Sequence, residues 1–136
     1  MSGHSMDIRI YYEDTDAGGV VYHASHLRFC ERGRTEYLRD LGFDQGQLRK
    51  EHDVFFVVRD LQASYRKPAA LDDLLRLETK VTELKKTRLI MKQSLFRHDV
   101  LIFDMDVTLV CVSTDSEGVT KAVPIPDHVY DQFLNT

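Results

Sequence analysis

Two hydrophobic periods divide the first part of the chain into a strand and a helix. Asp7 to Tyr12 alternates apolar and polar residues and is predicted to be a short strand. After a break at Glu13–Val21, the period becomes helical from Ser25 to Leu41. Ser25 is predicted to cap this helix and Gly42 to end it. One helical face is expected to be buried, with Leu27, Cys30, Gly33 or Arg34, Tyr37, Leu38 and Leu41.

The rest of the chain is dominated by the strand period. Asp44–His52 fits a short helix or a loop, and Asp127–Phe133 a terminal helical turn. Extended segments are expected at 54–67, 74–83, 87–96, 100–113 and 119–123. The breaks between the middle strands are short enough for hairpins, so the sheet must be largely antiparallel. The pattern predicts an α+β fold, in which a curved antiparallel sheet wraps around one long helix.

Length and composition favour one ordinary globular domain. The chain has 136 residues, and 43% are hydrophobic. We expect a single domain at 7–136, preceded by a tag or disordered segment at 1–6. A net charge of −4 disfavours nucleic acid as a partner, because phosphate binding needs concentrated positive charge. No apolar run approaches the roughly 20 residues of a membrane span, and the start lacks the features of a signal peptide. Two cysteines in a chain of this size indicate a reducing, cytoplasmic location.

One phosphotransferase-like pattern is misleading. Residues 103–109 (FDMDVTL) match the hydrophobic–DxDxT pattern of haloacid-dehalogenase-type phosphotransferases, whose aspartates bind Mg²⁺. Such chemistry needs a parallel sheet built after the pattern, and too few residues follow Thr108. Asp104, Asp106 and Thr108 are therefore expected to be polar positions on one face of a strand. Leu101, Phe103 and the alternate residues up to Cys111 are expected on the other face.

The segment between the first strand and the helix carries the richest chemistry. It reads YYEDTDAGGVVYHAS from Tyr11 to Ser25. Glycines at 18 and 19 allow the backbone to approach a ligand or to adopt a positive φ. The helix that follows presents unpaired N–H groups, which suit an oxyanion. A carboxylate just before such a helix is placed to act as a base or a nucleophile.

Spacing alone leaves other roles open for these residues. Asp14 and Asp16 could simply cap turns, and His23 could be an ordinary polar residue at a helix start. Asp14, Asp16 and His23 could also ligate a metal ion, but no second cluster completes a ligand set, so no metal is expected.

The same segment resembles a known family. The run YYEDTDAGGVVYHASHLRFCERGRTEYL at 11–38 is similar to the signature of hotdog-fold thioesterases of the 4-hydroxybenzoyl-CoA thioesterase group. The subgroup resembled is the YbgC-type acyl-CoA thioesterases encoded with the Tol–Pal envelope system. The likeness continues at 65–68 (YRKP), 71–73 (LDD) and 110–112 (VCV). It implies a five- or six-stranded sheet around a central helix. The sequence departs from the pattern at His26, Cys30 and Gly33.

The resemblance implies a site and a reaction. It assigns Asp16 as the catalytic carboxylate and a main-chain N–H near Tyr22 and His23 as the oxyanion donor. Tyr22 and His23 are themselves candidate catalytic residues, and Gly18 and Gly19 would contact the substrate. The implied reaction hydrolyses a short- to medium-chain or aromatic acyl-CoA to a free acid and CoA, without a cofactor. The group commonly forms homodimers or homotetramers.

We expect the phosphates of CoA to contact basic side chains at the edge of the site, although the net charge of the chain is negative. Two clusters of basic residues are candidates: Arg66 with Lys67, and Lys85 with Lys86 and Arg88. Each could instead be a set of solvated charges at a hairpin. Other activities also stay open. An acyl-ACP thioesterase, or a binding partner of acyl carrier protein in the envelope machinery, would share this fold. A dehydratase would pair His23 with Asp16.

Overall fold

The computed structural model describes residues 3–136 and contains six strands, three α-helices and one 3₁₀ turn. The strands are β1 (Gly3–Arg9), β2 (Phe55–Tyr65), β3 (Leu74–Leu84), β4 (Arg88–Arg97), β5 (Val100–Thr114) and β6 (Thr120–Ala122). The helices are η1 (Tyr12–Asp14), α1 (Ser25–Asp40), α2 (Gln45–His52) and α3 (Asp127–Leu134). The bounds agree with the predicted elements to within a few residues, except at β1.

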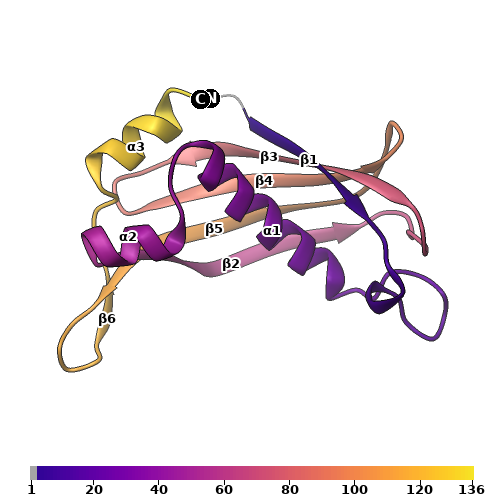
Figure 1. The fold of residues 1–136 in the computed structure, drawn as a ribbon, viewed down its shortest axis with the longest axis horizontal. Helices are drawn as coiled ribbons and strands as arrows, with labels where there is room; N and C mark the ends of the chain where they lie inside the picture. Colours follow the sequence, from indigo (N-terminus) through magenta and orange to yellow (C-terminus); the bar gives the residue numbers. More distant parts are fainter. Residues whose placement is uncertain (1–2) are drawn as a thin grey trace.

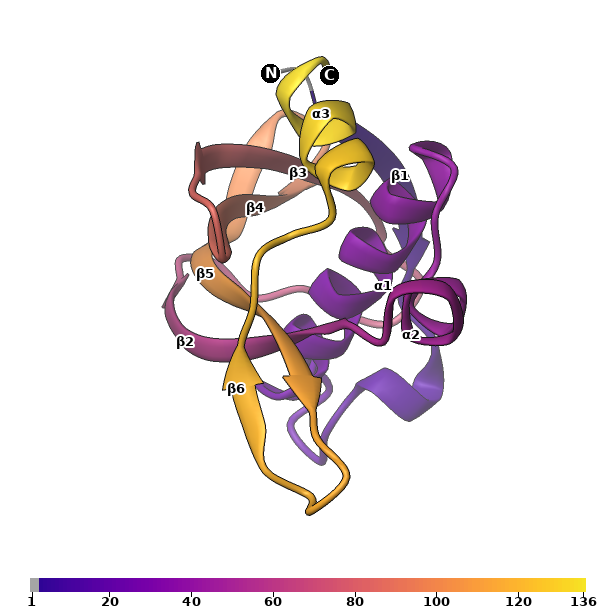
Figure 2. The ribbon, with the colours of Figure 1, turned by 90° about the vertical axis from the view of Figure 1, so that its left-hand side faces the viewer.

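The strands form one antiparallel sheet in the order β1-β3-β4-β5-β2, and β6 pairs with β5. The short β3–β4 and β4–β5 connections produce this order, because hairpin-linked strands pair with each other. The sheet curves around α1, which lies along its concave face (Figures 1 and 2). This is the α+β arrangement that the sequence predicted.

Helix α1 lies unusually close to the sheet at Gly33. A Cβ atom there would lie 2.4 Å from Leu77 Cδ2 and 3.0 Å from Thr79 Oγ1. The absent side chain therefore allows the helix backbone to approach β3 and β4. Below it, the fully buried Gln93 of β4 donates hydrogen bonds to the Cys30 carbonyl (2.8 Å) and to Thr79 Oγ1 (2.9 Å). A polar contact thus joins helix and sheet in the centre of the core.

The first strand lies earlier in the chain than the predicted Asp7–Tyr12, while the expected domain boundary at residue 7 stays a prediction. Strand β1 begins at Gly3, which pairs with Lys80 of β3, and the pairing continues to Arg9 opposite Leu74. The inward positions alternate through His4, Met6 and Ile8, and His4 stacks on Tyr37 with ring centroids 6.2 Å apart. The backbone ladder and this alternation extend the strand, although the composition looks like a tag. Residues 1 and 2 of the expected segment lie outside the described residues.

Two details of α1 also differ from the prediction. Ser25 is the first helical residue and not the cap; the cap is Ala24, which makes no side-chain capping hydrogen bond. The buried face is rotated toward His26 and Phe29, while Leu27 is only half-buried. The concave sheet covers a neighbouring stripe of the helix, so the face containing Leu27 lies at the side.

A β-bulge breaks the expected alternation of β5. Leu95 pairs with Phe103, whereas the next residue, Phe96, pairs with Leu101, so Ile102 is the extra residue. Leu101 therefore leaves the face that holds Phe103, and Ile102 is buried.

Candidate active site

The loop between β1 and α1 is organised by Asp14. Its side chain is 4% exposed, accepts a hydrogen bond from the Tyr11 amide (2.9 Å) and forms an ion pair with Arg28 at 3.5 Å. Its carbonyl accepts the Tyr22 amide at 2.9 Å. These contacts close the loop and join it to the first turns of α1. The interpretation of Asp14 as a turn-forming residue therefore fits its surroundings.

Asp16, in contrast, is exposed at the tip of the loop. A tight turn presents it: Gly19 N donates to the Asp16 carbonyl at 3.0 Å, and Gly18 N donates to Asp16 Oδ1 at 2.8 Å. Its carboxylate lines an open recess with Tyr12, Leu71 and three other loop residues, Thr15, Ala17 and Gly19. One carboxylate oxygen is thus oriented by the turn, and the side chain faces solvent.

The two glycines have conformational roles in this turn. Gly19 has a φ of +80°, which disfavours residues with a side chain, and a Cβ on Gly18 would lie 3.2 Å from Asp16 Oδ1. Both residues therefore set the position of the carboxylate. Direct contact of Gly18 and Gly19 with substrate remains a prediction.

Of the two amides proposed as oxyanion donors, those of Tyr22 and His23, the loop itself uses one. The Tyr22 amide is used by the Asp14 carbonyl, and the Ser25 amide donates to the Tyr22 carbonyl at 2.8 Å. The amide of His23 makes no hydrogen bond within residues 3–136. The Tyr22 and His23 rings lie 4.4 Å apart and are both exposed. The amide of His23 is therefore the better candidate of the two.

Two residues that sequence reasoning did not assign to the site support this peptide. Tyr65, at the end of β2, donates a hydrogen bond from its hydroxyl to the His23 carbonyl. His26 is 4% exposed, and its ring lies 5.0 Å from those of Tyr65 and Phe103. Burial lowers the pKa of His26, so its imidazole is neutral near pH 7. Only the YRKP likeness pointed to Tyr65, because residues 23 and 65 are far apart in sequence.

The structure separates the two basic clusters. Arg66 and Lys67 line a recess of about 250 Å³ with His23 and His26, so they lie beside the loop. The Lys85–Arg88 cluster is at the other end of β3 (Figure 1). That strand has 11 residues, which span roughly 35 Å. Among the two clusters, the first adjoins His23, which follows Asp16 on the same loop.

Arg66 has a partner of its own on the outer face of the sheet. Its guanidinium pairs with Asp104 at 2.6 Å, and Lys92 approaches the same carboxylate at 3.4 Å. The hydrogen bond from Arg66 lowers the pKa of Asp104. Asp104 and Asp106 thus occupy polar positions of an antiparallel strand, as expected. Lys67 forms no ion pair within residues 3–136.

Asp16 lines the recess at the loop tip, and His23 lines the recess beside Tyr65. A dehydratase-type pairing of His23 with Asp16 stays an untested alternative. Across residues 3–136, no three His, Cys, Asp or Glu side chains are grouped to hold a metal ion. In the same range, no helix is long and apolar enough to cross a membrane.

Comparisons with known proteins identify the relatives of this chain. The family model of the thioesterase-like superfamily matches residues 11–133. Acyl-CoA thioesterase YbgC of Haemophilus influenzae is 46% identical over 132 residues, covering 97% of this chain and 95% of that protein. Acyl-CoA thioester hydrolase YbgC of an Escherichia coli O6:H1 strain is 47% identical over 106 residues, covering 77% and 78%.

Solved structures extend the likeness to the fold. A probable thioesterase from Bartonella henselae superimposes with a TM-score of 0.82 at 35% identity, over 90% of this chain and all of that one. The 4-hydroxybenzoyl-CoA thioesterase of Pseudomonas sp. strain CBS-3 gives 0.90 at 22% identity, covering 97% and 99%. The sheet around α1 is thus the hotdog fold. The chain belongs to the thioesterase-like superfamily.

Proposed function

We propose that this protein is an acyl-CoA thioesterase that hydrolyses its substrate with Asp16 and the N-terminal end of α1. The observation that carries the proposal is the pairing of an exposed, turn-held carboxylate with the unused His23 amide on one loop. Family membership and relatives named as acyl-CoA thioesterases support the same activity.

The mechanism follows from where charge develops. The thioester oxygen would accept a hydrogen bond from the His23 N–H, which stabilises the oxyanion as the carbonyl carbon is attacked. Asp16 either attacks this carbon itself or takes a proton from the attacking water. Collapse of the intermediate breaks the C–S bond and releases CoA. If Asp16 is the nucleophile, this leaves an acyl–Asp16 anhydride, which water then hydrolyses to the free acid. The balance is acyl-CoA and water in, carboxylic acid and CoA out, and no further cofactor is needed.

The unpaired edge of β2 supports a homodimer. This strand is 11 residues long and lies at the end of the sheet, with exposed Val58, Leu61 and Tyr65. A long edge with apolar side chains tends to pair with another strand. A second copy on this edge would lie beside His23, because Tyr65 contacts its carbonyl. We expect light scattering to give a mass of two or four chains, and a monomer would contradict this.

Two further parts of the proposal concern the location of the protein and the carrier of its acyl group. We place the protein in the cytoplasm, where acyl-CoA is available and where its two buried, unpaired cysteines stay reduced. A carrier-bound acyl group remains the alternative substrate, since its reacting thioester is the same. A panel of acyl-CoA and acyl-ACP substrates, followed by thiol release, tests the function. No turnover of any acyl-CoA by the folded protein would refute it.

Lys67 is our candidate contact for the CoA phosphates. Changing it to Ala should raise KM about two- to fivefold and leave kcat nearly unchanged, because a remote charge contact stabilises ground and transition states alike. The wild-type KM should rise with salt, and less so in the variant. The exposed Lys121, on β6, provides the control K121A.

The Lys85–Arg88 cluster provides the result that would contradict the assignment of the phosphates to Lys67. If the triple change of Lys85, Lys86 and Arg88 to Ala raises KM while K67A does not, the nucleotide is bound at the far end of β3. Within a single chain that end is too distant from Asp16. Such a result would assign the phosphates to the partner subunit.

A further inference from the structure

Arg28 connects the first turn of α1 to the loop that carries Asp16, although 53% of its side chain is exposed. Its Nη2 atom donates a hydrogen bond to Ser25 Oγ at 2.9 Å and lies 3.5 Å from Asp14 Oδ1. The Ser25 hydroxyl in turn donates to the Asp14 carbonyl at 3.3 Å. One guanidinium nitrogen therefore contacts both the Asp14 carboxylate and the hydroxyl that binds the Asp14 carbonyl.

The carboxylate of Asp14 depends on this contact because it is buried. Its Oδ1 atom makes no hydrogen bond within residues 3–136. In the same range, Arg28 is the only cation that pairs with Asp14. A buried charge without a partner is costly, so removal of the guanidinium would drive this carboxylate toward solvent. Such a movement would change the shape of the loop around it.

Asp14 lies between the two parts of the proposed reaction centre. Its carbonyl accepts the Tyr22 amide at 2.9 Å, which holds the residue next to His23. Asp16 follows two residues after Asp14, and its own amide donates to the Val20 carbonyl at 2.9 Å. Displacement of Asp14 therefore moves Asp16 relative to the His23 amide, and so alters the geometry of the reaction.

The position of Arg28 opposes the usual charge preference of a helix. The N-terminal end of an α-helix favours negative charge, but Arg28 places a cation in the first turn of α1, where no residue is acidic. The cap residue, Ala24, makes no side-chain hydrogen bond there. Negative charge comes instead from Asp14 in the loop. The contact between Arg28 and Asp14 thus takes the place of an ordinary cap and joins the helix start to the loop.

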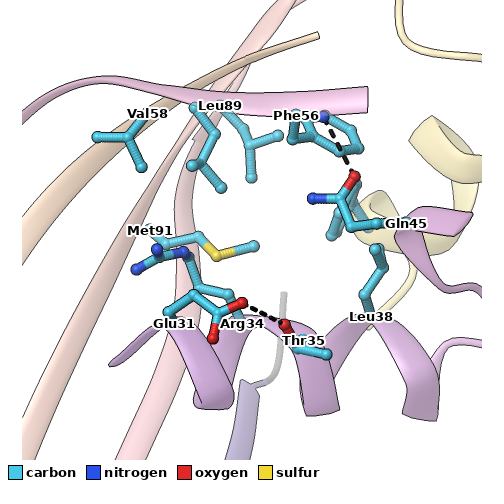
Figure 3. A pocket seen from close by; sticks show the side chains of 11 residues that line it. Glu31, Arg34, Thr35, Leu38, Gln45, Phe56, Val58, Leu89 and Met91 are labelled. Carbon is cyan, nitrogen blue, oxygen red and sulfur yellow. Dashed lines mark hydrogen bonds between the residues drawn. The ribbon is translucent and has the colours of Figure 1, made fainter. Parts of the chain in front are cut away.

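The paired polar side chains farther along α1 have partners away from the loop. Thr35 donates to Glu31 at 3.1 Å beside the sheet (Figure 3), and Arg34 donates to Gln93 of β4 at 2.9 Å. Arg32 is exposed and forms no ion pair within residues 3–136. It is therefore a matched control for a substitution of the exposed arginine that does contact the loop.

We propose that Arg28 is a positioning residue for the hydrolysis. It acts through Asp14, which holds Asp16 and the His23 amide in reactive geometry. The inference rests on the proposed thioesterase function. Because the loop acts on the charge that develops during the reaction, loss of Arg28 should lower kcat more than it raises KM. The proposed contact of Lys67 with the CoA phosphates is retained.

Substitutions of Arg28 test this role by steady-state hydrolysis of an acyl-CoA that the wild type turns over. R28A should lower kcat about tenfold and change KM by no more than about twofold. R28K should recover most of the loss, because one nitrogen makes both contacts and a lysine ammonium can replace it. Guanidinium ion at millimolar concentration should partly restore R28A. R32A should keep the wild-type kcat, and thermal unfolding checks that every variant is folded.

A double-mutant cycle tests whether Arg28 acts through Asp14. The combined variant R28A/D14N should lose less activity than the product of the two single losses, because both substitutions break the same contact. Losses that multiply would show that the two residues act independently, and would overturn the proposal.

The remaining outcomes separate this inference from the function itself. If the folded wild type hydrolyses no acyl-CoA, the proposed thioesterase function fails. If it does so but R28A keeps the wild-type kcat, or loses no more than R32A, only the role of Arg28 is wrong. A loss that neither R28K nor guanidinium reverses would also refute it. Should R28A not fold, R28Q takes its place in the same comparisons.

Discussion

Changing Asp16 to Asn should lower kcat at least about 100-fold, while the protein folds as before. The substitution keeps the shape and an oxygen that can still accept the Gly18 amide, so the turn survives. It removes the charge and the basicity that either mechanistic route requires. Steady-state hydrolysis of the best acyl-CoA, with circular dichroism of both proteins, gives the comparison.

The neighbouring Glu13 offers a matched control. It is also exposed on the same loop, but no recess near the helix start includes it. E13Q should therefore retain turnover within about twofold. Wild-type kcat in D16N would remove Asp16 from the mechanism. Equal losses in both variants would indicate a general effect of loop charge.

Replacing Gln93 by Met should lower the free energy of unfolding by about 2–3 kcal/mol. Methionine has nearly the same shape, so little volume changes. The substitution removes hydrogen bonds to the Cys30 carbonyl and the Thr79 hydroxyl, and the acceptor of Arg34. Thr79 is 1% exposed, so water cannot replace its partner there.

Urea denaturation measures this change in the free energy of unfolding. It is followed by far-UV circular dichroism, because the chain has no Trp for a fluorescence signal. Ser94 is the adjacent residue of β4 and points to the other face. S94A should stay within about 0.5 kcal/mol of the wild type. A loss of similar size in S94A, or none in Q93M, would contradict a special role for the buried amide.

The fold was largely predictable because its determinants are local. A change in the hydrophobic period of the sequence separated α1 from the strands. The short breaks between successive predicted strands implied an antiparallel sheet. The predictions failed at features that depend on contacts between segments far apart in the sequence. The start of β1 depends on pairing with β3, and the bulge at Ile102 depends on the register with β4. The buried face of α1 depends on how the sheet curves around it.

The site was predictable only in part, for a related reason. Asp16 and His23 stand within eight residues, so one segment revealed them. Tyr65 reaches the His23 carbonyl from another strand, and no local spacing encodes that contact. Likewise, nothing in the sequence separated Lys67 from the Lys85–Arg88 cluster. Only the course of β3 places one beside the loop and the other far from it.

The two cysteines bear on how activity can be observed. Cys30 and Cys111 are fully buried, and burial raises the pKa of their thiols to about 12 and about 11. Reagents that report free thiols react with thiolates, which these residues hardly form near neutral pH. In native protein, the colour from such a reagent therefore counts CoA molecules released by turnover. A signal that grows without substrate would report unfolding of the core instead.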